Sequence, residues 1–208
     1  MENLNLILFI SIAAPLAMML FIYKGSSRTS LLFLLLGVAV CLFCGEFSGL
    51  IMKLTPFSRS YYTANCTPLF EEVFKAIPIL VYAFLYQPKR QQLLESAIGV
   101  GVGFAVLENA FILAGNVGLV SIPLALVRGF CSGMMHGVCT LAVGYGMTFV
   151  NTRRKLFYTG TVALLTAAVI YHSVYNTLVV SQYAFVGYLL PACTFLPLVA
   201  VLIRKKVL

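Results

Sequence analysis

Long apolar segments dominate this chain and limit what it can fold into. A segment that crosses a bilayer needs roughly 20 apolar residues to span a core of about 30 Å. About seven stretches meet this need, and they lie near residues 4–23, 30–52, 67–86, 94–115, 122–150, 156–180 and 183–203. The predicted fold is therefore all-α, a polytopic bundle of transmembrane helices that forms a single membrane domain over residues 1–208.

Composition and charge exclude a soluble globular protein. The chain is 61% hydrophobic and 10% charged, whereas soluble domains are about 45–50% apolar and about 25% charged. A net charge of +8 would suggest nucleic-acid binding in a soluble protein. Here most basic residues stand in short clusters between apolar stretches, where they orient a membrane protein. The expected partner is the lipid bilayer, not nucleic acid.

The distribution of the basic residues predicts the orientation in the membrane. Only Lys53 and Arg59 fall in outer loops, while Lys75 and Arg128 lie within predicted spans. Cytoplasmic loops are rich in Lys and Arg, so the N-terminus is expected outside and the C-terminus in the cytoplasm. Ten basic residues fall on the cytoplasmic side: Lys24, Arg28, Lys89, Arg90, Arg153, Arg154, Lys155, Arg204, Lys205 and Lys206.

Ionisable side chains inside the apolar stretches are the most informative feature. Each charge near the bilayer centre costs about 2.5–3.5 kcal/mol, so such groups must face one another or a wet cavity, and they mark functional sites. Glu95, at the cytoplasmic end of the fourth stretch, is expected to be solvated, and Glu46 stands alone on the second. The eight ionisable residues within the stretches are Glu46, Glu71, Glu72, Lys75, Glu108, Arg128, His136 and His172.

The depth and spacing of the seven residues on the third to sixth stretches, Glu46 being set apart on the second, predict that they converge in the outer half of the bundle. Glu71 and Lys75 are four residues apart and share a helix face. Asn176 follows His172 by four residues, so its amide could hold the ring or a substrate carbonyl. In the fifth stretch a polar stripe lies beside a ridge of glycines that lets another helix approach closely. The stripe is Arg128, Ser132, His136 and Thr140, and the ridge is Gly129, Gly133 and Gly137.

Two kinds of water activation fit these residue types. A set of two His and one Glu can bind Zn²⁺, with another carboxylate as general base; the candidate ligands are Glu108, His136 and His172. Alternatively, a buried Glu acts as the base without a metal, and the histidines with Asn176 stabilise the oxyanion. No H-E-x-x-H motif is present and each His lies on a different stretch, so spacing leaves both alternatives open.

Four ordered motifs carry a family resemblance. They are Phe70-Glu-Glu-Val-Phe-Lys75, Gly103-Phe-Ala-Val-Leu-Glu-Asn109, Arg128 followed by His136, and His172-Ser-Val-Tyr-Asn176. Over roughly residues 67–180 the chain resembles the PrsW family of intramembrane proteases, which is related to the CAAX prenyl protease superfamily. The resemblance implies a catalytic set of Glu71, Glu72, Glu108, His136 and His172, with Lys75, Asn109, Arg128 and Asn176 in support.

The function implied by the resemblance is intramembrane proteolysis. The expected substrate is a single-span membrane protein, cut at site 1 near the extracytoplasmic face, and proteins similar to this one cut anti-sigma factors. The expected location is the bacterial cytoplasmic membrane. Two other classes stay open: a proton-coupled transporter, which also needs buried Glu, His and Lys, and a non-catalytic binding or immunity protein built on the same fold. The histidines alone could also serve as interhelical packing contacts.

Overall fold

The computed structural model describes residues 4–22, 27–116 and 120–205, so Lys24 and Lys206 of the orientation argument lie outside the described residues. Throughout these ranges the regular structure is helical, which confirms the all-α prediction. A short helix, α3 (Arg59–Asn65), joins α2 to α4. The long helices are α1 (Leu4–Ile22), α2 (Ser27–Met52), α4 (Thr67–Tyr86), α5 (Arg90–Gly115), α6 (Ile122–Met147), α7 (Arg154–Val179) and α8 (Ala184–Arg204).

The long helices have the character of membrane spans. Five of those described, α2, α5, α6, α7 and α8, are long and apolar enough to cross a membrane. In α1 the apolar segment is shorter, Leu6–Met19. Helix α4 has 20 residues but carries Glu71, Glu72 and Lys75. The protein is thus a multi-pass membrane protein, and crossing by α1 and α4 stays a prediction.

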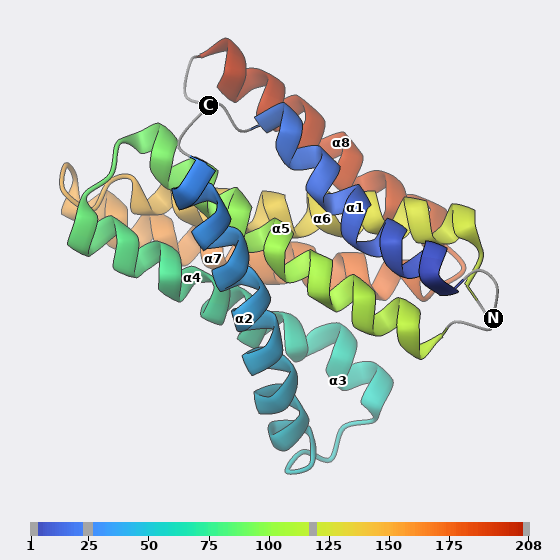
Figure 1. The fold of residues 1–208 in the computed structure, drawn as a ribbon. Helices are drawn as coiled ribbons and strands as arrows, with labels where there is room; N and C mark the ends of the chain where they lie inside the picture. Colours follow the sequence, from blue (N-terminus) through green and yellow to red (C-terminus); the bar gives the residue numbers. More distant parts are fainter. Residues whose placement is uncertain (1–3, 23–26, 117–119, 206–208) are drawn as a thin grey trace.

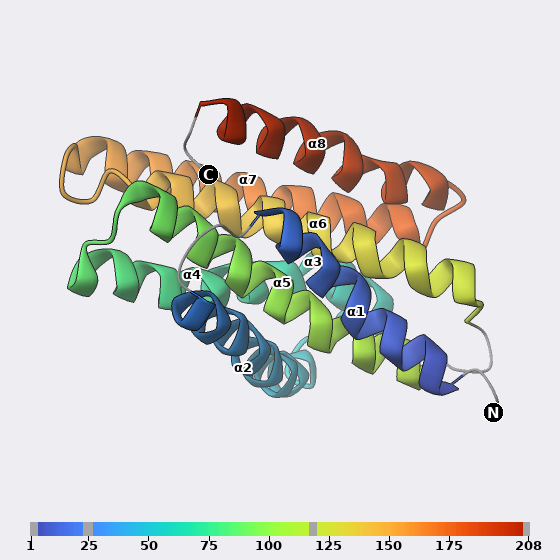
Figure 2. The same cartoon turned by 45° about the horizontal axis from the view of Figure 1, so that its top comes forward.

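The helices alternate in direction through the bundle. Figures 1 and 2 show the α4–α5 loop and the α6–α7 turn at one end, and the ends of α5 and α7 at the other. The start of α1 and the end of α8 lie at opposite ends of the bundle (Figure 1). Lys89 and Arg90 therefore share one end with Arg153 to Lys155, as the charge distribution requires, while the side of the membrane stays a prediction.

Helix α5 occupies the centre because glycines let its neighbours approach closely. It contacts α1, α2, α4 and α6. A Cβ on Gly103 would overlap the backbone carbonyl of Leu34 on α2, and one on Gly101 would overlap the carbonyl of His136 on α6. Small residues that permit backbone contact are a common basis of helix packing in membranes. These two contacts fix the rotation of α5, and so the direction in which Glu108 points.

The predicted glycine ridge of α6 also permits close packing. A Cβ on Gly129 would lie 2.9 Å from Cβ of Ala14, and one on Gly133 would lie 3.2 Å from Cβ of Pro15, both on α1. Gly137 faces the ring of Phe195 on α8 instead. The ridge therefore seats α1 and part of α8 on one side of α6, which leaves its other side for the polar stripe.

Gly103→Ala is expected to destabilise the protein by about 3 kcal/mol, the upper range for overpacking, because its methyl group would meet backbone and not a flexible side chain. Thermal unfolding in detergent measures the change. The matched control is Gly115→Ala in the same helix, where an added Cβ meets nothing within 4 Å in the described structure. Equal unfolding temperatures for the two variants would contradict the close contact of α2 with α5.

Three features differ from the sequence-based expectations. Helix α5 begins at Arg90, four residues before the predicted 94, so Glu95 falls within its second turn. The interpretation of Glu95 as a solvated charge is wrong: it is buried, and Gln91 Nε2 donates to its Oε1 at 2.9 Å. Helix α3 was not predicted; Ser58 caps it by accepting from the Tyr61 amide at 3.3 Å. Its polar sequence lacks the apolar length that identified the spans.

Candidate functional site

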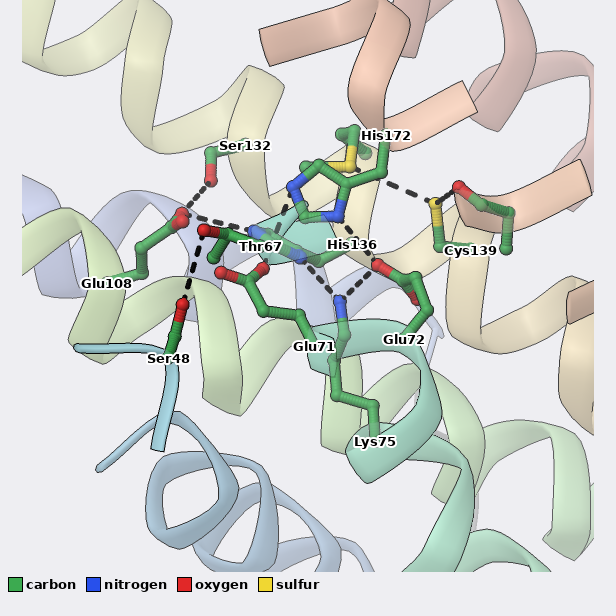
Figure 3. A network of polar contacts seen from close by, with 12 residues as sticks. Ser48, Thr67, Glu71, Glu72, Lys75, Glu108, Ser132, His136, Cys139 and His172 are labelled. Carbon is green, nitrogen blue, oxygen red and sulfur yellow. Dashed lines mark hydrogen bonds and ion pairs between the residues drawn. The ribbon is translucent and has the colours of Figure 1, made fainter. Parts of the chain in front are cut away.

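The ionisable residues of four different helices meet in one buried cluster. Glu71, Glu72 and Lys75 come from α4, Glu108 from α5, His136 from α6 and His172 from α7 (Figure 3). Lys75 and both histidines are fully buried. The rings of His136 and His172 stand edge to face with centroids 4.9 Å apart. The predicted convergence of these residues is therefore seen, and each buried charge has neighbours that reduce its cost.

Lys75 contacts both a carboxylate and a histidine of the cluster. Its Nζ lies 2.6 Å from Glu72 Oε1 and 2.8 Å from His136 Nδ1. It also lies over the ring of Phe104, 4.6 Å from the centroid, a favourable position for a cation. Because an ammonium group only donates hydrogen bonds, His136 Nδ1 is the acceptor and its Nε2 carries the ring proton.

Glu72 orients His172. Its Oε1 lies 2.8 Å from His172 Nδ1, and since a carboxylate only accepts, Nδ1 carries a proton; in the neutral ring Nε2 then presents a lone pair. That Nε2 lies 3.7 Å from Glu71 Oε2. Neither of these two atoms has a hydrogen-bond partner within the described residues. Buried polar atoms are nearly always satisfied, so this gap between two acceptors calls for a water, a proton or a cation.

Glu108 contacts three of the four residues of the polar stripe of α6. Its Oε2 lies 3.1 Å from His136 Nε2, 3.5 Å from Ser132 Oγ and 3.9 Å from a terminal nitrogen of Arg128. These three residues are spaced four apart on α6, so one helix face presents all of them to the same carboxylate. Thr140, the fourth member of the stripe, donates back to the His136 carbonyl at 2.9 Å instead. It lies one turn beyond the reach of Glu108.

The donor set fits a metal ion. Glu71, His136 and His172 each offer a ligand atom, and the three atoms lie within 4.8 Å of one another. Zn–N and Zn–O bonds are about 2.0–2.2 Å, so donors 3.7 Å apart can share an ion. Metal-bound histidines usually donate a hydrogen bond to a carboxylate through their other ring nitrogen, as His172 Nδ1 does to Glu72. His136 would bind through Nε2 only by giving up its bond to Glu108.

The metal ligands predicted from the sequence were Glu108, His136 and His172. The group in the structure contains both histidines but has Glu71 in place of Glu108. Glu71 and Glu72 are adjacent in sequence but do different things, because neighbouring helical residues point about 100° apart. Glu72 is committed to Lys75 and His172, whereas Glu71 leaves Oε2 without a hydrogen bond within the described chain. Sequence alone could not separate the two.

A cavity of about 320 Å³ adjoins the cluster. Glu71 and Glu108 form part of its wall, so it gives the site a route toward the α3 end of the bundle. Ser48 on α2 also lines it, and its Oγ lies 3.3 Å from Thr67 Oγ1 on α4 (Figure 3). Glu46, which matched no motif, lies on the same wall.

The supporting residues divide into those that join the cluster and those that do not. Lys75 and Arg128 contact its carboxylates. Asn109 is fully buried, and its amide has no hydrogen-bond partner in the part of the chain described. Asn176 does not hold the ring of His172, whose nitrogens face Glu72 and Glu71. Contact with a substrate carbonyl stays a prediction for Asn176.

Tyr175 was not singled out by the sequence. It is fully buried, and its hydroxyl lacks a hydrogen-bond partner among the described residues. Its position three residues after His172 places it on the same helix face, and that spacing was the available signal. The hydroxyl partners of the cavity wall, Ser48 and Thr67, were missed because isolated Ser and Thr residues are common in membrane helices.

The chain matches a known protein family. Residues 13–202 match the family described as PrsW family intramembrane metalloprotease. The match covers most of the chain and all four helices of the cluster. No curated protein and no solved structure matches the chain significantly.

Proposed function

Because the chain belongs to the PrsW family of intramembrane metalloproteases, we propose that it hydrolyses a peptide bond of a membrane-anchored substrate with water activated between Glu71 and His172. The observation that carries this proposal is the 3.7 Å gap between Glu71 Oε2 and His172 Nε2. Two buried acceptors in that gap could both receive hydrogen bonds from one water. A carboxylate placed there can then remove a proton as the water attacks.

The residues around this gap would keep the reaction geometry fixed. Glu72 holds the proton on His172 Nδ1, so Nε2 stays an acceptor toward the gap. On the other side of the cluster, His136 Nε2–H and Arg128 face Glu108. A substrate carbonyl that displaced Glu108 from these donors would meet preformed stabilisation for an oxyanion.

A metal ion would be held by Glu71, His136 and His172, the group whose ligand atoms lie together. Bound there, Zn²⁺ would supply Lewis-acid polarisation of the water or carbonyl. Glu72 would then orient His172 as a ligand, just as it orients the ring in this structure. The family description favours this alternative, and the metal-free alternative uses the same Glu71 as general base.

The substrate we propose is a single-span membrane protein cut at site 1, near its extracytoplasmic end. Glu71 and Glu72 lie in the first two turns of α4, next to α3, and Glu108 and His172 lie about 10 Å from the ends of their helices at 1.5 Å per residue. With the predicted orientation this is the outer half of the membrane. By family resemblance an anti-sigma factor of the bacterial cytoplasmic membrane is the proposed physiological substrate.

Cleavage in detergent with and without a chelator tests the function and the metal together. The purified protein is incubated with a designed single-span peptide, and we expect cleavage that a zinc chelator abolishes and Zn²⁺ restores. Bound zinc is measured separately, and His172→Ala should lose it while Asn176→Ala keeps it. Cleavage that survives the chelator but not Glu71→Gln would favour the glutamate-activated water.

The two other function classes give different results in the same system. A transporter would move protons or solutes across vesicle membranes without cutting any peptide. A binding or immunity protein would leave its partner uncut. It would bind that partner equally well as the wild type and as the Glu71→Gln variant. Intact peptide after incubation with the zinc-loaded wild-type protein, across several designed sequences, would contradict the protease proposal.

A further inference from the structure

The cavity beside the cluster has one wall of small residues against which no other described part of the chain packs. Gly45 and Gly49 of α2 line it, and a Cβ on either would meet nothing within 4 Å in the described structure. Two turns earlier on the same helix, a Cβ on Gly37 would overlap the backbone of Val100 on α5. Helix α2 thus packs tightly on α5 in one half and leaves a space beside it in the other.

The arrangement of the helices explains this space. In Figure 1 α2 crosses the bundle obliquely, and its second half diverges from α5 with α3 beside it. Exposed apolar side chains flank the cavity on both of these helices, Leu42 on α2 and Phe111 and Ile112 on α5. In a membrane such side chains face lipid, so the cavity is bordered by the bilayer between α2 and α5.

The interior of the cavity also offers hydrogen bonds that a lipid chain would not need. The hydroxyl-bearing residues Ser48, Thr63 and Thr67 line it together with the apolar residues. A peptide must be unwound to be hydrolysed, and each unsatisfied backbone group then costs several kcal/mol in the absence of water. Hydroxyl groups beside a glycine wall therefore suit a polypeptide backbone better than an acyl chain.

The cavity is continuous with the reacting groups. Glu71 lines it, is more than nine-tenths buried, and leaves Oε2 without a hydrogen-bond partner among the described residues. Glu108 lines it as well. A segment lying along the glycine wall would thus have its backbone next to both carboxylates, with no further channel needed to reach them.

We propose that this cavity binds the unwound outer end of the substrate's membrane span, which reaches it sideways from the bilayer between α2 and α5. Gly45 and Gly49 give room for the substrate backbone. The hydroxyls of Ser48, Thr63 and Thr67 already donate within the chain, so their oxygens accept hydrogen bonds from the free amide groups of the substrate. This inference rests on the proposed protease function. It further predicts that the substrate carries small residues at its outer end, because the cavity holds only about 320 Å³.

Crosslinking tests the docking site independently of cleavage. The photocrosslinking residue p-benzoylphenylalanine replaces Leu42 at the cavity mouth. In the matched control it replaces Leu50 on another face of α2. Both leucines are exposed, at 51% and 60%. The probe is a designed span of about 20 apolar residues with Gly and Ser at its outer end, and the protein carries Glu71→Gln so that the probe stays intact. We expect several-fold more crosslinked product from position 42 than from position 50. Equal yields from the two positions, or no product from position 42, would overturn the proposal.

A second measurement asks whether the glycine wall matters for cleavage. Gly49→Leu should lower the cleavage rate of the same probe by about tenfold or more, as expected when a pocket changes size, with thermal unfolding unchanged because the site has space. Gly160→Leu, at the opposite end of the bundle, should cleave at the wild-type rate. Unchanged cleavage in Gly49→Leu together with loss in Glu71→Gln would overturn the docking site and leave the protease function standing.

Discussion

Glu71→Gln is expected to abolish cleavage without lowering the stability of the bundle. Removing a general base or a group that activates water typically costs about 10²–10⁴-fold in rate. In the folded protein, however, Glu71 Oε2 has no hydrogen-bond partner among the described residues, and its distance to His172 is 3.7 Å. A neutral amide of the same shape removes the cost of burying a carboxylate. The free energy of unfolding should therefore stay the same or rise.

Cleavage of a designed single-span peptide and thermal unfolding in the same detergent measure the two effects. The matched control is Glu95→Gln. Glu95 is also a buried glutamate, but it lies near the start of α5, away from Glu108, so this variant should cleave normally. Normal cleavage by Glu71→Gln would remove Glu71 from the proposed chemistry. A large loss of stability would show instead that Glu71 is a structural charge partner.

Lys75→Met and Glu72→Gln are expected to have the opposite signature, a large loss of stability. Their side chains are fully buried and their charged atoms lie 2.6 Å apart. Removing one partner of a buried ion pair leaves the other charge uncompensated, at a cost of about 3–5 kcal/mol. Both variants should also lose cleavage, because Glu72 orients His172 and Lys75 contacts His136.

The double variant Lys75→Met with Glu72→Gln separates stability from activity. Replacing both members of a buried pair by neutral groups is often nearly neutral, so the double variant should unfold at a higher temperature than either single variant. Cleavage should not return, since the orienting carboxylate is still missing. Additive losses of stability, in which the double variant is the least stable, would contradict a direct pairing of the two charges.

Together these variants assign distinct roles to two adjacent residues. Glu72 accepts two hydrogen bonds through one oxygen and fixes the positions of a lysine and a histidine. Glu71 makes no comparable contact within the described chain and lines the cavity. The first is expected to control stability and activity, and the second activity alone.

The sequence determined the elements of this protein. In the described part of the chain, seven long helices occur where seven apolar stretches were predicted, with boundaries shifted by at most four residues, as at Arg90. Hydrophobic length is a local property, because a segment in lipid must satisfy its own backbone hydrogen bonds. For the same reason the short polar helix α3 escaped prediction: its apolar content is too low to identify it.

The sequence also determined which residues belong to the cluster. Charges within apolar stretches must find partners, and Lys75, Glu108, Arg128, His136 and His172 did find them. Helical spacing placed Arg128, Ser132 and His136 on one face, and all three point at a single carboxylate. Spacing within one helix could not say which carboxylate that would be.

Only the tertiary structure decided the pairings between helices and the shape of the space around them. That Glu72 holds His172, a residue 100 positions away, depends on how α4 and α7 are rotated about their own axes. Close backbone contacts at Gly101 and Gly103 set the rotation of α5 in the same way. A rotation of α4 by one residue, about 100°, would exchange Glu71 with Glu72. The cavity beside Gly45 and Gly49 likewise exists because α2 diverges from α5, an angle that no local pattern in the sequence contains.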